Sequence, residues 1–147
     1  EIGVRLVGSE MCIRDRFTRL SALPDTEVRR NISLPVKIPS SGLVVLRDGN
    51  IGEPDILLSP VCYVFHHRAE IEVLVQKTDD ADNDARLDRL LEAIGRLLVV
   101  DTTFSGLIDH MHAEPPEFIE QPVEGGLTIK AAIIPVILEY VSDSNLT

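Results

Sequence analysis

The sequence predicts a single α+β domain in which one main amphipathic helix packs on one face of an antiparallel or mixed β-sheet. Three observations lead to this prediction. A long stretch alternates apolar and polar residues, a helical apolar stripe follows it, and shorter apolar runs lie before and after the pair. The 147 residues, 44% apolar and 26% charged, suit one globular domain with a core of its own.

The clearest strand covers residues 61–76. Apolar and polar residues alternate over its whole length, which is typical of a half-buried antiparallel strand. The inward face is expected to hold Tyr63, Phe65, His67, Ala69, Ile71, Val73 and Val75. The outward face is expected to hold His66, Arg68, Glu70, Glu72 and Gln76.

The main helix is expected over about residues 82–99. Apolar residues recur there at helical spacing, and Asp82 or Asp84 can cap its start. We expect one stripe of the helix to be buried against the strand face that contains Ile71, Val73 and Val75. That stripe consists of Leu87, Leu91, Ile94 and Leu98.

Shorter elements are expected in the rest of the chain. The predicted strands are residues 27–32, 42–47, 107–112 and 127–140, and residues 17–23 form the end of a helix. The last strand is expected to be interrupted or placed at an edge at Pro135, because proline cannot donate to a β-ladder. Residues 113–126, with three prolines and two glycines, predict a loop or a protruding hairpin tip.

Residues 1–16 differ in character from the rest. The string VGSEMCIRDR resembles a translated sequencing-adapter read-through, so we interpret residues 1–16 as a non-native segment and residues 17–147 as the domain. The alternative is a genuine helix start. The segment contains three acidic and three basic residues and leaves the net charge unchanged. Its deletion is expected to leave stability and assembly as they are.

The charge excludes some partners. The net charge of −10, with 24 acidic against 14 basic side chains, argues against tight or sequence-specific nucleic-acid binding. An acidic wall can still stand beside DNA and let it pass. No apolar run is long enough for a membrane span. The two cysteines, Cys12 and Cys62, cannot form a disulfide framework, so a reducing cytosol is expected.

Residues able to carry chemistry are present but do not form a known motif. His110 and His112 would share one strand face, and a metal would need a third ligand such as Glu114 or Glu70, so surface histidines are the favoured interpretation. Cys62 is interpreted as an inert thiol. The acidic run at residues 79–84 lacks the glycine and final glutamate of an EF-hand. We therefore predict no enzyme, no cofactor, and no catalytic or metal-binding residue.

The stretch from residue 30 to residue 73 carries a specific pattern. Its elements are Arg30-Asn31, Leu34-Pro35, Ile38-Pro39, Gly42-Leu43, Val45-Leu46-Arg47-Asp48-Gly49, Gly52-Glu53-Pro54, Leu58-Ser59-Pro60, Tyr63 and His67-Arg68-Ala69-Glu70. This pattern resembles the tail terminator proteins of phages and prophages, of the lambda-like minor tail protein U type. The later helix, DTTFSGLIDHM (residues 101–111) and AAIIPVILEY (residues 131–140) agree with it, so the resemblance covers about residues 17–140.

The resemblance implies a non-enzymatic assembly protein. Such subunits form a homo-oligomeric ring, commonly hexameric, on the last ring of tube protein. They stop tube polymerisation and offer a surface to the head-completion protein, so the expected location is the virion tail after assembly in the bacterial cytoplasm. The alternatives are a head–tail connector or tail completion component and, from another class, a small-molecule-binding or enzymatic α+β domain.

The same resemblance directs attention to residues 48–54, which we expect to form a surface loop between two apolar strands. The candidate interface residues are Arg47, Asp48, Gly49 and Glu53. Arg47 is the expected anchor, because its planar guanidinium can bind a carboxylate of a neighbouring subunit through two hydrogen bonds. The alternative is a tight hairpin turn at Asp48-Gly49 that serves only local geometry.

Overall fold

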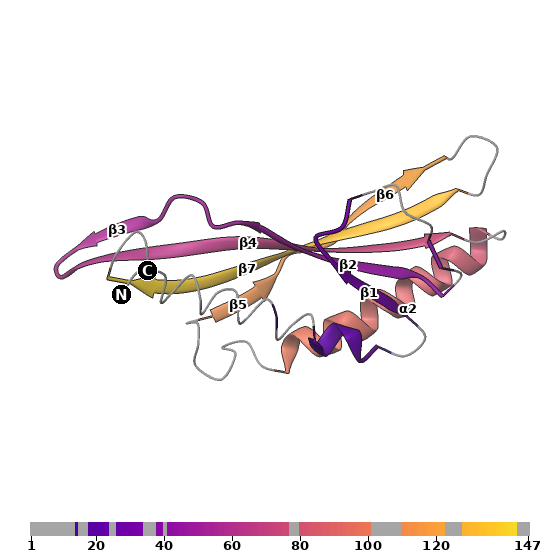
Figure 1. The fold of residues 1–147 in the computed structure, drawn as a ribbon, viewed down its shortest axis with the longest axis horizontal. Coiled ribbons are helices and arrows are strands. Elements are labelled where there is room, and N and C mark those ends of the chain that lie inside the picture. The colour runs from indigo at the N-terminus through magenta and orange to yellow at the C-terminus, as the bar shows by residue number, and fades with distance from the viewer. Residues whose placement is uncertain are drawn as a thin grey trace.

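The structure is a computed structural model that describes residues 14, 18–23, 26–33, 38–39, 41–76, 80–100, 110–122 and 128–143. Seven strands form one mixed sheet, and one long helix packs on it, which confirms the predicted α+β class (Figure 1). The elements are β1 (Glu27–Arg30), β2 (Leu43–Asn50), β3 (Asp55–Leu58), β4 (Val61–Gln76), α2 (Asp80–Val99), β5 (His110–Ala113), β6 (Glu117–Gln121) and β7 (Ile129–Ser142).

The two long strands β4 and β7 form the spine of an elongated sheet (Figure 1). They pair antiparallel from Tyr63 with Ser142 to Gln76 with Ile129. The main strand order is β1-β2-β4-β7-β5, with β3 on β4 and β6 on β7, and the β1–β2 pair is parallel. Figure 1 places β3 at one end of the spine and β6 toward the other.

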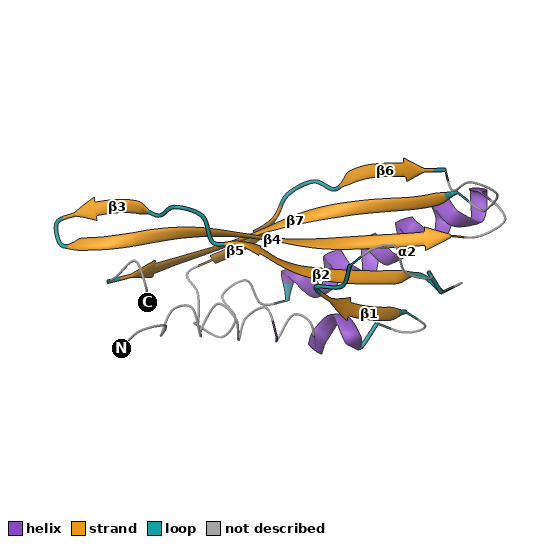
Figure 2. Ribbon diagram, turned by 45° about the horizontal axis from the view of Figure 1, so that its top comes forward, coloured by secondary structure: helices purple, strands orange, loops and turns teal. Residues whose placement is uncertain are grey.

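Helix α2 covers one face of the sheet, as Figure 2 shows. Its buried stripe is Leu87, Leu90, Ile94 and Leu98. These side chains share a core with Ile71, Val73 and Val75, which confirms the predicted contact between helix and strand. The prediction was wrong for one residue, Leu91, which is only partly buried. The buried residues recur every three or four positions, and Leu90 occupies the buried position instead.

A smaller apolar cluster lies on the opposite face. It consists of Ile38, Leu43, Val45 and Leu74, with Ile32, Ile129 and Ala131 packed around it. Strand β2 therefore buries residues on both faces, which explains its unbroken apolar start, Leu43 to Leu46, all buried.

Pro135 does not interrupt β7, contrary to one of the two predicted outcomes. It pairs with Glu70 of β4, and its carbonyl accepts a hydrogen bond of 2.8 Å from the Glu114 N–H. On an antiparallel strand, the N–H and the carbonyl of one residue point to the same side. The missing N–H of Pro135 therefore faces the short connection between β5 and β6, where no ladder hydrogen bond is lost, so proline is accommodated although β7 is an inner strand and not an edge.

Several predicted boundaries need correction. Strand β6 lies in the stretch predicted as a loop or hairpin tip, and strand β3 was missed; of the strand predicted at residues 107–112, residues 110–112 belong to β5 and the rest lies outside the described residues. Residues 17–23 were predicted as the end of a helix. Residues 18–21 are helical, and Leu20 and Leu23 belong to the main core. The prediction for residues 1–16 lies outside the described residues apart from Arg14. Within the described ranges, no helix combines the length and apolar character needed to cross a membrane.

Candidate functional site

Strand β2 continues through the residues that were predicted to end it. Asp48 and Gly49 are not a hairpin turn but part of a β-bulge, since Arg47 pairs with Glu70 and Asn50 with Arg68. Gly49 has a φ of 71°, and a Cβ there would lie 1.8 Å from the carbonyl oxygen of Arg68. The position requires glycine on both counts. The surface loop consequently begins at residue 51 rather than at residue 48.

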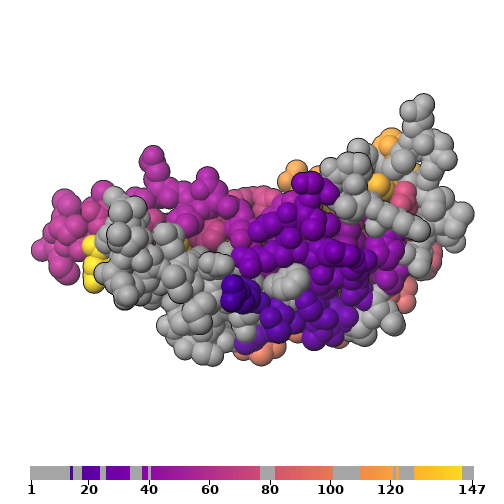
Figure 3. All heavy atoms as spheres, viewed as in Figure 1, coloured from indigo at the N-terminus to yellow at the C-terminus, as the bar shows by residue number. Residues whose placement is uncertain are grey.

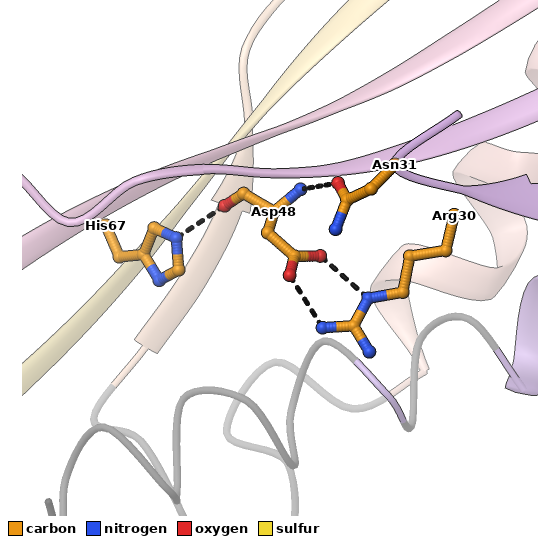
Figure 4. Close-up of polar contacts among 4 residues, drawn as sticks. All are labelled: Arg30, Asn31, Asp48 and His67. Carbon is orange, nitrogen blue, oxygen red and sulfur yellow. Dashed lines mark hydrogen bonds and ion pairs between the residues drawn. The ribbon is translucent and has the colours of Figure 1, made fainter. Parts of the chain in front are cut away.

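Asp48 on β2 is bound by residues of β1, the end of β1 and β4 (Figure 4). Its carboxylate accepts two hydrogen bonds from Arg30, from Nε at 2.8 Å and from Nη2 at 2.7 Å. Its N–H donates to Oδ1 of Asn31 at 3.0 Å. Its carbonyl lies 2.5 Å from Nε2 of His67, so Nε2 carries the proton and donates, because a carbonyl can only accept. The cluster joins β1, β2 and β4.

The cluster shifts two titrations. The hydrogen bond from Arg30 is the main cause that lowers the pKa of Asp48 below its ordinary value, with burial acting in the opposite direction. Burial lowers the pKa of His67, against the opposing effect of the Asp48 carbonyl. His67 is 4% exposed and lies on the inward face of β4, as the alternation predicted. A neutral histidine and an ionised aspartate therefore stabilise this part of the sheet.

Arg47 lies on the strand beside Asp48, and consecutive strand residues face opposite sides of a sheet. Its Nη2 donates to Oε2 of Glu72 at 2.9 Å, and its Nη1 donates to the carbonyl of Ile32 at 2.9 Å. The hydrogen bond with Glu72 is the main cause that raises the pKa of Arg47. The guanidinium fork is thus engaged within the chain, where it ties the segment after β1 to the outer face of the sheet.

The four predicted interface residues do not form one surface. Arg47 and Asp48 face opposite sides, and Gly49 serves the bulge. Glu53 is exposed in the loop of residues 51–54, where the Gly52 N–H donates to Oδ1 of Asn50 at 3.0 Å. An interface role for these residues stays a prediction.

The structure instead explains why the sequence pattern contains these residue types. Arg30, Asn31, Asp48 and Gly49, together with His67 and Arg68, are separated in the chain but meet around one bulge. The contacts are internal, and every polar group named holds one strand to another. These six residues of the sequence pattern thus form the joint between β1, β2 and β4.

A second surface was missed by sequence reasoning. Strands β3 and β4 form a hairpin at residues 55–63, here called the arm, which extends beyond the helix-covered part of the sheet (Figures 1 and 3). Ile56, Leu57, Leu58 and Val61 are 55%, 54%, 80% and 54% exposed. A signal was available: the string DILLSPV places apolar residues on both sides of a Ser-Pro turn.

The remaining groups able to carry chemistry in the described ranges do not come together in one place. His110 and His112 stack on β5 with ring centroids 5.9 Å apart. His66 lies 3.1 Å from Glu139, measured from Nε2 to Oε1. Cys62 is a partly buried free thiol. Among the described residues, no three His, Cys, Asp or Glu side chains come together as a metal site.

No protein-family model matches the chain, and no curated protein sequence matches it.

Proposed function

We propose that this chain is a structural subunit of a phage or prophage tail, of the tail-terminator type. Copies of the chain form a hexameric ring on the end of the tail tube, stop tube polymerisation and present a surface to the head-completion protein. The ring belongs to the virion tail and is assembled in the bacterial cytoplasm. The apolar arm is the observation that carries this proposal.

The arm has the character of a contact surface. Ile56 and Leu58 of β3 pair with Tyr63 and Val61 of β4, so their side chains share one face of the hairpin. That face continues the inward, core-forming face of β4, and its apolar period is kept into the exposed tip. A solvated hairpin would carry polar residues at these positions. Contiguous exposed apolar side chains mark sites of association.

Two further observations support a structural role. Four residues of the sequence pattern, Arg30, Asn31, Asp48 and His67, hold strands together by hydrogen bonds within the chain. The net charge of −10 suits a subunit that stands beside a DNA passage without binding the DNA, because like charges repel.

The test has two parts. Native mass spectrometry and negative-stain imaging of the purified chain should show a closed ring of a fixed number of copies. Added to polymerising tube protein of the phage that encodes the chain, the ring should shorten the tubes in proportion to its concentration. A monomer at high micromolar concentration, or rings that leave tube length unchanged, would contradict the proposal. Rings that bind heads but not tubes would favour a head–tail connector instead.

A further inference from the structure

A hollow of about 360 Å³ opens between α2 and β6. It is lined by Leu87 of the helix, Phe118 and Ile119 of β6, and Ala131 of β7, with Asp84, Glu120 and Lys130 completing the lining. Phe118 and Ile119 are 61% and 43% exposed. We infer that this hollow receives the arm of a second copy of the chain. The inference rests on the proposed ring and names the contact that builds it.

The arm and the hollow lie toward opposite ends of the β4–β7 spine (Figure 1). The arm is formed where β4 begins, and the hollow lies near Lys130, where β7 begins. Because β4 and β7 are antiparallel, these two positions are far apart. A contact between unlike surfaces at opposite ends repeats from copy to copy and closes into a ring when the rotation allows.

A symmetric contact fits these surfaces less well. If two arms packed against each other, Phe118 and Ile119 would stay exposed in both copies. A contact between arm and hollow covers both apolar surfaces of every subunit at once. The face of the arm that bears Leu58 lies on the helix side of the sheet, and so does Phe118 of the hollow, which pairs with the buried core residue Ala132; Ile119 and its partner Ala131 belong to the opposite face.

The dimensions are compatible. A cavity of roughly 150 Å³ holds a benzene ring, so the hollow of about 360 Å³ has room for two side chains of leucine size. The exposed apolar surface of the arm is on the order of a few hundred Å², against roughly 800 Å² that each partner buries in a stable interface. Each interface buries the arm of one copy and the hollow of the next, so the apolar contact alone is smaller than this area, and pairing between strand edges adds to it.

Backbone pairing can add to the contact. Among the described residues, β3 pairs with β4 alone and β6 pairs with β7 alone. Within the part of the chain that the structure describes, the outer edge of each of these strands pairs with no further strand, and such edges associate by adding a strand. The arm of one copy brings its β3 edge to the β6 edge of the next, so side-chain and main-chain contacts form together.

Three single variants test the contact. Leu58→Lys places a charge on the arm, Phe118→Lys places one in the hollow, and Val99→Lys is the matched control, because Val99 is 74% exposed and belongs to neither surface. All three positions are exposed, so all three variants should keep the wild-type circular dichroism spectrum. In native mass spectra, the arm and hollow variants should be monomers and the control should form the wild-type ring. Rings formed by either of the first two variants would overturn the inference.

Mixing the two monomeric variants gives the sharper result. The Leu58→Lys copy keeps an intact hollow, and the Phe118→Lys copy keeps an intact arm, so an equimolar mixture should form a dimer with one copy of each and nothing larger. An arm-to-arm contact predicts instead that Phe118→Lys dimerises alone and that mixing adds nothing. That outcome would refute the contact between arm and hollow.

The inference and the proposed function fail in different ways. If wild-type rings shorten tubes but the mixture of variants does not dimerise, the tail-terminator proposal stands and the contact is wrong. If the mixture dimerises as expected but wild-type rings leave tube length unchanged, the contact stands and the tail-terminator proposal is wrong. A wild-type chain that stays monomeric overturns both.

Discussion

The bulge at Gly49 permits a controlled test of the joint between β2 and β4. Gly49 and Gly52 have almost the same positive φ, 71° and 74°. They differ in their surroundings: a Cβ at residue 49 would lie 1.8 Å from the Arg68 carbonyl oxygen, whereas a Cβ at residue 52 would meet nothing within 4 Å. The substitutions Gly49→Ala and Gly52→Ala therefore share the conformational penalty and differ in the steric one.

The shared penalty is roughly 1–2 kcal/mol for placing an L-residue in the left-handed region. At residue 49 the obstacle is backbone, which cannot rotate away as a side chain can, so β2 and β4 must separate locally. Overpacking of this kind costs about 1–3 kcal/mol. We expect Gly49→Ala to lose about 2–5 kcal/mol of unfolding free energy and Gly52→Ala about 1–2 kcal/mol.

Urea denaturation followed by circular dichroism measures both losses. The sequence contains no tryptophan, so far-ultraviolet ellipticity is the appropriate signal. Both variants and the wild type should be compared at one protein concentration, because association makes apparent stability concentration-dependent. Equal losses for the two variants would refute the reasoning, since they would mean that the Arg68 carbonyl exerts no steric effect at residue 49.

Three further predictions follow from the core and the charged groups. Ile94→Ala should lose about 2–5 kcal/mol of unfolding free energy and Leu91→Ala clearly less, because Ile94 is 0% exposed and Leu91 is only partly buried. Equal losses of the two variants in urea denaturation would contradict this packing. Stability should fall as the pH drops below about 6.5, the ordinary histidine value, because burial lowers the pKa of His67 and the unfolded chain then binds more protons. His67→Gln should flatten that part of the stability profile, and an unchanged profile would exclude His67 as its source. Arg47→Glu should lose about 2–3 kcal/mol of unfolding free energy, because it places a carboxylate against Glu72. Adding Glu72→Arg should restore part of the loss. A stable Arg47→Glu variant that forms no ring would instead support an interface role for Arg47.

The parts of the fold that could be predicted are those in which one periodic pattern acts alone. The alternation of β4 predicted its inward face correctly, including the buried His67. The helical stripe predicted which side of α2 is buried. Both patterns indicate which residues of an element face the core and which face the solvent, and this can be determined within each element alone.

The parts that could not be predicted depend on contacts between distant residues. Asp48-Gly49 has the composition of a turn, but Arg30 holds the Asp48 side chain and the Arg68 carbonyl fills the space beside Gly49, so the strand continues through a bulge. Arg47 was predicted to bind a carboxylate of another subunit, whereas in the structure it donates a hydrogen bond to Glu72 of its own chain. In both cases the residue types indicated the interaction, and only the strand register determined the partner.

The pairing of β4 with β7 also has a consequence for the order of events during synthesis. Every contact of that pairing joins residues at least 53 positions apart, from Gln76 with Ile129 to Tyr63 with Ser142. At roughly 5–20 residues per second on the ribosome, β7 is completed seconds after β4 has emerged. Such non-local pairing folds slowly. Nascent chains therefore expose the edge of β4 that pairs with β7, and the hairpin tip, until β7 has been synthesised. Premature contact between copies is to be expected on crowded polysomes.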